Sequence, residues 1–263
     1  MGLDRQENEE SLDESEHVEA TNNRQQVEHA TPIYTYFLVG LIIVVFLTQL
    51  AFASIPTQVP EADRTVLLAG FVKPLFLMGE YWRILTGGTV HSGIVHVAFN
   101  SYALYVLGKL FEVLSNRSHL AIVFILSIIG GGSLSLIFLN SPSVGASGGV
   151  IGFLGYLTAY GFKRRKLLPS SFLKNMIFNI ALIAVLGIFV IPNVDNFGHL
   201  GGFIVGIVYG FAQVPSDLYK DPREASQVAH ILGYIALGIF ILTCIFTILL
   251  LSNVISFDYS FIR

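Results

Sequence analysis

Apolar runs separated by polar or charged loops follow one another along most of this chain. They lie at about 34–54, 93–111, 119–139, 147–162, 176–191, 199–214 and 230–251. About 20 apolar residues in a helix cross the ~30 Å hydrocarbon core of a bilayer, so runs of this kind are typical of transmembrane helices. The pattern predicts an all-α polytopic membrane protein with seven transmembrane helices.

The composition supports this class. Hydrophobic residues make up 53% of the chain and charged residues only 13%, whereas an ordinary globular protein carries about 25% charged residues. The single cysteine, Cys244, lies inside the last apolar run. The sequence therefore predicts neither a disulfide nor a cysteine-based metal site.

The chain divides into three segments. Residues 1–31 are rich in aspartate and glutamate and have no apolar periodicity, which predicts a disordered acidic tail. This tail lacks the basic start and the early apolar core of a signal peptide. Residues 32–215 hold the first six runs, and residues 216–263 hold a loop, the last run and a short outer tail.

The connection at 56–92 is long and unusually apolar for a loop, and it contains Trp82. Long connections without structure are uncommon in compact domains, and tryptophan is enriched at membrane interfaces. We expect a structured element that is partly sunk in the membrane surface.

Basic residues in the loops predict the orientation. Lysine and arginine follow the second, fourth and sixth runs, but the loops after the third and fifth runs have none. By the positive-inside rule, the even-numbered helices end in the cytoplasm. The N-terminus is then cytoplasmic, the C-terminus lies outside, and we expect the protein in the cell membrane.

A few polar side chains inside the runs lie at one depth. Ser147, His96 and His199 each precede the polar end of their run by sixteen or seventeen residues, which is ~24 Å of helix. Asn100 follows His96 by four residues and shares its helix face. Polar residues within membrane helices are functional candidates, and the three counts agree independently.

Glycines indicate which helices meet. They recur at four-residue steps in two runs, at Gly148 and Gly152, and at Gly198, Gly202, Gly206 and Gly210. Small residues at this spacing let membrane helices approach closely, which would bring Ser147 near His199. Ser147 alone could be a helix N-cap within a packing face, but beside His199 it is better explained as a nucleophile with its base. No carboxylate lies inside a run, and Asp195 falls in an outer loop, so a dyad is favoured over a triad.

Four motifs in order give the chain a family resemblance. They are Glu80-x-Trp82-Arg83-x-x-Thr86, His91-x4-His96-x3-Asn100, Gly145-x-Ser147-Gly148 and Gly198-His199-x-x-Gly202. Over about 34–214 the chain resembles the rhomboid family of intramembrane serine proteases. The resemblance implies a rhomboid-like six-helix bundle as the core at 32–215, plus one extra C-terminal transmembrane helix, with the loop 56–92 associated with the membrane.

The resemblance also implies the catalytic roles. Ser147 would be the nucleophile and His199 the general base. His96 and Asn100 would form the oxyanion hole with the backbone N–H of Ser147, and Gly145 would shape that loop.

Other matched residues would support the site. His91 would order the region and its water, Trp82 and Arg83 would brace the first loop, and Gly148 and Gly202 would form the helix contact. The family needs no metal and no cofactor. The expected partners are the lipid bilayer and transmembrane protein substrates, cut near the outer face, and not nucleic acid.

Two points stay open at this level. A rhomboid-like membrane chaperone or escort without protease activity is the main alternative, although such proteins lack the dyad. A transporter or channel is a further alternative. It would require charged residues near the membrane centre or paired broken helices, and the sequence shows no clear sign of either. In addition, Ile151 stands where the family commonly has an aromatic residue that stacks on the catalytic histidine, and Phe153 or Phe197 could substitute for it.

Overall fold

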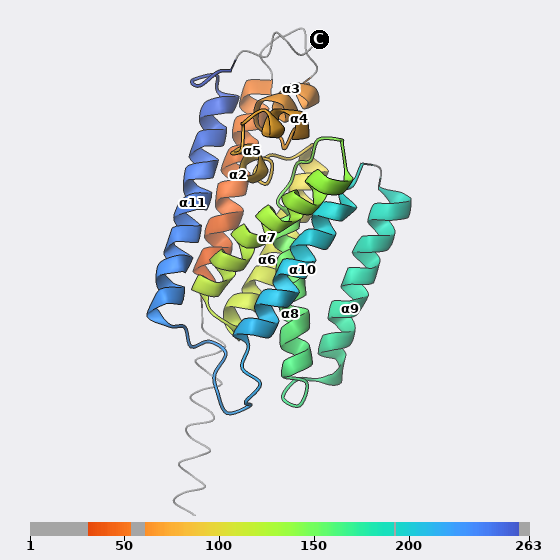
Figure 1. Ribbon diagram of the computed structural model, residues 1–263, viewed down its shortest axis with the longest axis vertical. Coiled ribbons are helices and arrows are strands. Elements are labelled where there is room, and N and C mark those ends of the chain that lie inside the picture. Colours follow the sequence, from red (N-terminus) through yellow and green to blue (C-terminus); the bar gives the residue numbers. More distant parts are fainter. Residues whose placement is uncertain (1–30, 54–60, 192, 258–263) are drawn as a thin grey trace, which may run out of the picture.

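The computed structural model describes residues 31–53, 61–191 and 193–257. Within these residues the secondary structure is helical, apart from one isolated antiparallel bridge between Phe71 and Ser143. The predicted acidic tail lies, except for its last residue, outside the described residues, as does the end of the outer tail at 258–263. The expectation of an all-α fold is confirmed (Figure 1).

Each of the predicted apolar runs corresponds to one helix. These are α2 (Ile33–Ala53), α6 (Ile94–Leu114), α7 (Arg117–Phe138), α8 (Ser147–Lys163), α9 (Ser170–Val185), α10 (Asn196–Gln213) and α11 (Gln227–Leu251). A π-helical turn, Leu186–Val190, continues α9.

One predicted boundary is wrong by six residues. We expect the fifth run to begin at 176, but α9 begins at Ser170, directly after Pro169 at its N-cap. The segment between these two starts contains Lys174 and Asn175. Both side chains are exposed on the helix surface, where a polar residue does not end a helix.

In the described part of the chain, five helices are long and apolar enough to cross a membrane: α2, α6, α7, α9 with its π turn, and α11. The exceptions, α8 and α10, have 17 and 18 residues and carry many glycines in place of larger apolar residues. The chain is therefore a multi-pass membrane protein in which the two shorter helices lie among longer ones.

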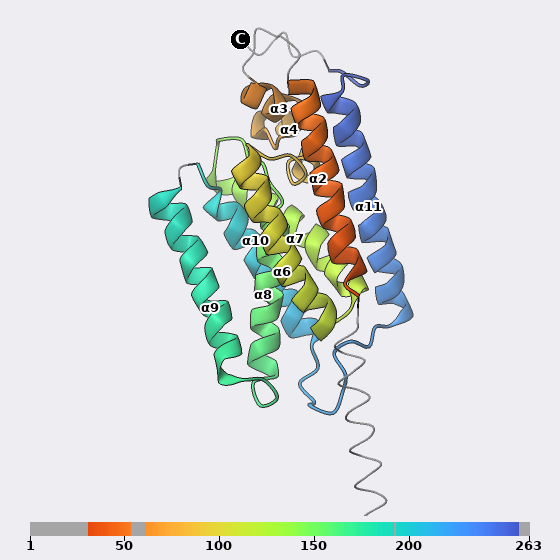
Figure 2. The same ribbon diagram turned by 180° about the vertical axis from the view of Figure 1, so that it is seen from behind.

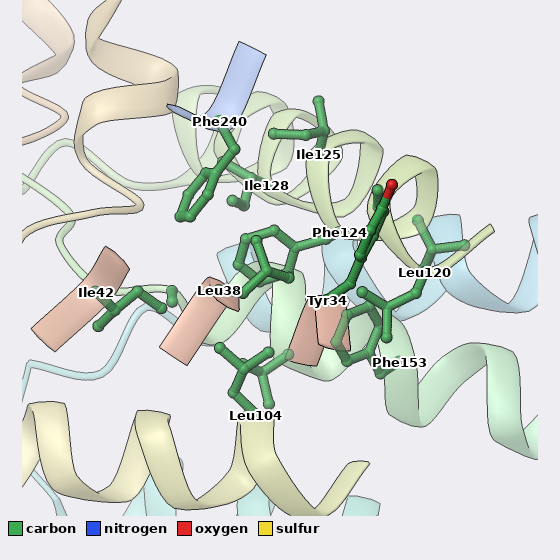
Figure 3. Close-up of a cluster of buried hydrophobic side chains, with 14 of the residues drawn as sticks. Tyr34, Leu38, Ile42, Leu104, Leu120, Phe124, Ile125, Ile128, Phe153 and Phe240 are labelled. Atoms are coloured by element: carbon green, nitrogen blue, oxygen red, sulfur yellow. The ribbon is translucent and has the colours of Figure 1, made fainter. Parts of the chain in front are cut away.

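The shorter helix α8 lies at the centre of the bundle. Nearly all of its residues from Gly149 to Gly161 are buried, and α10 packs along it (Figure 1). In contrast, α9 stands at the edge of the molecule in both views (Figures 1 and 2), and Met176 is the one buried residue between Ser170 and Val185. The core beside α8 includes Leu38, Leu104, Phe124 and Phe153 from four different helices (Figure 3).

The first loop contains three short helices, α3 (Glu61–Ala69), α4 (Lys73–Leu77) and α5 (Arg83–Thr86). They gather at one end of the bundle, beside the start of α6 (Figure 1). The Arg83 side chain is fully buried among them. It donates to Glu80 Oε2 (2.6 Å), Gly70 O (2.9 Å) and Leu67 O (2.8 Å).

The last helix supports this loop as well. The Trp82 ring packs edge-on against Phe246 of α11, with ring centroids 5.2 Å apart. A buried pair of hydroxyls, Thr89 Oγ1 and Thr247 Oγ1, lies 3.0 Å apart. Helix α11 therefore stabilises the segment that leads into α6.

Replacing Arg83 by methionine should destabilise the protein strongly. The substitution keeps most of the buried volume but removes the hydrogen bonds from the Arg83 guanidinium to Glu80 Oε2 and to the Gly70 and Leu67 carbonyl oxygens. Removing one partner of a buried pair costs about 3–5 kcal/mol. A thermal melt of the purified protein measures the effect. Arg165→Met is the matched control, because Arg165 is exposed; equal melting temperatures for the two variants would contradict this role of Arg83.

Candidate active site

Ser147 and His199 lie on the wall of one small cavity. Ser147 is the first residue of α8, and His199 is in the first turn of α10. The cavity has a volume of about 50 Å³, and Gly145, Gly148 and Asp195 also line it. A water molecule needs roughly 10–15 Å³ on this measure, so the cavity has room for water beside these two side chains.

Close contact between α8 and α10 sets the relative position of these two side chains. A Cβ atom added to Gly202 would lie 2.1 Å from the Gly148 carbonyl oxygen, and one on Gly206 would lie 1.9 Å from the Gly152 oxygen. The backbones of α8 and α10 are therefore in direct contact, without side chains between them.

Ser147 is not the cap of its helix. Ala146 occupies the N-cap position of α8, and no side chain caps the helix there. The interpretation of Ser147 as a structural N-cap is therefore wrong, and its hydroxyl is available to the cavity.

The catalytic candidates are not hydrogen-bonded to each other in the described structure. His199 Nδ1 is buried and has no hydrogen-bond partner among the described residues. Catalytic hydrogen bonds are often long before substrate binds and shorten in the complex. The position of the imidazole therefore depends on the start of α10, which carries it.

Two polar side chains of α6 approach the backbone just before Ser147. Gly145 has φ +115°, a conformation that side chains disfavour. A Cβ atom there would lie 2.7 Å from the ring of His96 and 3.8 Å from Asn100 Nδ2. Glycine at 145 thus lets both side chains of α6 approach the backbone that leads into Ser147.

The Asn100 and His96 side chains of α6 are themselves held by hydrogen bonds. Asn100 Nδ2 donates to the His96 carbonyl oxygen (3.0 Å), so one amide hydrogen remains for another acceptor. His96 Nδ1 lies 2.9 Å from Ser92 Oγ. With Nδ1 paired in this way, His96 Nε2 remains to face the Gly145 backbone.

His91 fixes the same segment from the first loop. Its Nε2 accepts from the Ala146 backbone N–H (3.4 Å), and its ring lies edge-on to that of His96. Burial, and to a lesser extent the neighbouring His96, lowers the pKa of His91 to about 3. His91 is therefore neutral near pH 7 and able to accept this hydrogen bond.

Gln49 of α2 was missed from the sequence. Its side-chain Nε2 donates to the His91 carbonyl oxygen (2.8 Å), and its Oε1 accepts from the His91 N–H (3.0 Å). An amide side chain inside an apolar run is itself a signal, so this residue could have been found.

The structure shows where the two candidate aromatic substitutes for Ile151 lie. Phe153 packs against Phe111 and Phe124 in the core, and Phe197 stacks on Phe138 with ring centroids 5.0 Å apart. Among the described residues, no aromatic ring stacks on His199. Likewise, no group of three His, Cys, Asp or Glu side chains suited to a metal occurs in the part of the chain that the structure describes.

The fold and this cavity define a multi-pass helical membrane protein with a serine and a histidine at one end of its bundle. The Rhomboid domain family model matches residues 78–216, which is more than half of the chain. The chain therefore belongs to the rhomboid family.

Several known proteins are similar to this chain. Rhomboid protease GluP of Bacillus subtilis (strain 168) is 32% identical over 216 residues, covering 81% of this chain and 40% of that protein. RHOMBOID-like protein 6, mitochondrial, of Arabidopsis thaliana is 33% identical over 156 residues (56% and 49%). RHOMBOID-like protein 4 of the same plant is 36% identical over 141 residues (53% and 36%). The chain thus spans less than half the length of each of these relatives.

Proposed function

We propose that this protein is a serine endopeptidase that cleaves transmembrane segments of other membrane proteins. One observation carries the proposal: the glycine contact between α8 and α10 places Ser147 and His199 on the wall of a single cavity. Membership of the rhomboid family and the similarity to a rhomboid protease support the same reaction class.

The reaction would use the two side chains in turn. His199 takes the proton of the Ser147 hydroxyl, and the serine oxygen attacks the carbonyl carbon of the scissile bond. His199 then gives the proton to the leaving amine. Water, activated by the same imidazole, hydrolyses the acyl-enzyme and regenerates Ser147.

The negative oxygen of the tetrahedral intermediate needs donors in place beforehand. The Ser147 backbone N–H, the remaining Asn100 amide hydrogen and His96 are assigned this role, since both side chains lie over Gly145. His91 and Gln49 hold the backbone of this oxyanion site.

The orientation in the membrane is part of the proposal. The basic connections between α8 and α9 and between α10 and α11 lie at the end of the bundle opposite the first loop (Figure 1). By the positive-inside rule this basic end is cytoplasmic. Cleavage then takes place toward the outer face of the cell membrane, with the N-terminus inside and the C-terminus outside.

Proteomics of shed ectodomains tests the function. Cells that carry the native protein should release membrane-protein fragments that cells with Ser147→Ala do not release. Identical fragment profiles in the two strains would instead favour a non-proteolytic membrane escort.

Asn100→Ala should slow turnover by ~10-fold to 10³-fold, because loss of one oxyanion donor typically costs ~10²–10³ in rate and other donors remain. Ser147 should still react with a fluorophosphonate, since its base is unchanged. Turnover and melting temperature are measured on one preparation. Native turnover with a slightly lower melting temperature would show that Asn100 only stabilises the bundle, as interhelical bonds worth about 0.6 kcal/mol do.

A further inference from the structure

A lysine is buried in the first loop and contacts Ser143, which lines the cavity. Lys73, in α4, is only 4% exposed. Its Nζ donates to the Ser141 carbonyl oxygen (2.5 Å) and to Ser143 Oγ (2.5 Å), and it lies 4.9 Å from the centre of the Phe71 ring. Burial lowers the pKa of Lys73 to about 8, so the group is still mainly an ammonium at pH 7. A buried cation is costly unless it is hydrogen-bonded, and here both oxygens belong to the loop before Ser147.

The Ser143 hydroxyl links Lys73 to a carboxylate. It accepts from Lys73 and donates to Asp195 Oδ2 (2.5 Å). A hydroxyl has one proton, so Ser135, whose Oγ is 3.1 Å from Ser143 Oγ, must be the donor in that pair. The loop also pairs with the first loop through the bridge between Phe71 and Ser143. Three segments far apart in the sequence are therefore joined at one hydroxyl.

Asp195 connects this chain of hydrogen bonds to the helix of His199. Its Oδ1 accepts from the Gly198 N–H (2.7 Å), and its carbonyl oxygen accepts from the His199 N–H (3.0 Å). Asp195 and His199 line the same cavity and interact electrostatically. The start of α10 therefore carries both the imidazole and the carboxylate, and His199 Nδ1 has no hydrogen-bond partner in the described structure.

We propose that Lys73 and Ser143 are positioning residues that hold the Asp195 carboxylate at the start of α10, where it orients His199 and stabilises its imidazolium form. This inference rests on the proposed protease function. It gives the first loop a direct part in catalysis: displacement of α4 would withdraw Lys73, release the carboxylate and leave His199 less well placed.

The test uses kinetics of the full-length protein on a transmembrane substrate. Asp195→Asn keeps an oxygen to accept from the Gly198 N–H but removes the charge, and Lys73→Met removes the ammonium at similar volume. Each should lower kcat by about 10-fold to 100-fold, the scale of one lost hydrogen bond to a charged group. KM should change little, because a positioning residue of this kind acts on the catalytic step and not on substrate binding.

Coupling between the two sites is the decisive readout. If Lys73 acts through Asp195, the double variant should be no slower than Asp195→Asn alone, because residues in one network are non-additive. Ser143→Ala should give the same defect, and Ser143→Thr, which keeps the hydroxyl, should recover most of the native kcat. Lys174→Met, at an exposed lysine on α9, is the matched control and should remain native.

Other outcomes would overturn the inference. A native kcat in Lys73→Met or in Ser143→Ala would contradict the positioning role. The role would also be contradicted if the losses in kcat were additive in the double variant and followed the melting temperatures of the variants. Ser147→Ala in the same assay separates the two claims. If Ser147→Ala is inactive while Lys73→Met is native, only the positioning role fails; if Ser147→Ala is as active as the native protein, the protease function fails and the inference fails with it.

Discussion

Alanine at Ser147 or at His199 should reduce cleavage of a transmembrane substrate to background. Ser147 supplies the attacking oxygen and His199 the proton acceptor, so neither half of the pair works alone. Loss of either partner of such a pair costs at least ~10⁴-fold in kcat, and the double variant should be no slower than the single ones because the two residues act as a unit. Rates are measured with purified protein in bilayers.

Both variants should remain folded. Ser147 is small and does not cap α8, and His199 Nδ1 makes no hydrogen bond to the described residues that its loss would break. Melting temperatures close to native would therefore accompany the loss of activity. Substantial proteolysis by Ser147→Ala would contradict the assignment of the nucleophile, and a rate loss fully explained by unfolding would contradict the role of His199.

Gly202→Ala should damage both stability and catalysis. The added methyl group would lie 2.1 Å from the Gly148 carbonyl oxygen, which is backbone and cannot move like a side chain, so α8 and α10 must separate. Overpacking of this kind typically costs about 1–3 kcal/mol. A shift of about 1 Å between catalytic groups can cost ~10²-fold in rate, and Gly148 is the neighbour of Ser147.

Gly238 of α11 provides the matched control, because an added Cβ there meets no atom within 4 Å. Gly238→Ala should retain its melting temperature and its turnover, since the same helix-favouring change is made without a clash. If Gly202→Ala and Gly238→Ala behave alike in thermal melts and in kinetics, the contact between α8 and α10 does not position the site.

The parts of this structure that repeat along the sequence could be predicted from it. Each apolar run is one helix, and the four-residue spacing of glycines such as Gly202 and Gly206 marks the face where α10 meets α8. Both signals are local, since helix periodicity and small-residue spacing are set within a few turns. The resemblance to a family then supplied roles for single residues that spacing alone left open.

The parts that depend on contacts between distant segments could not be predicted. Lys73, Ser143 and Asp195 are separated by 70 and 52 residues, and each is an ordinary loop residue when taken alone. The first loop was expected to be structured, but the bounds of its three short helices and the early start of α9 were not predicted, for a related reason. Their boundaries follow from packing and capping, not from where the apolar residues begin.

Covalent labelling of the nucleophile tests the central claim most directly. The full-length protein in a bilayer is treated with a fluorophosphonate, which reacts with activated serines, and the modified peptide is located by mass spectrometry. We expect one adduct, on Ser147, which is lost in Ser147→Ala and strongly reduced in His199→Ala. An adduct on another serine, or equal labelling of native and His199→Ala protein, would contradict the assignment of Ser147 and His199 as the catalytic pair.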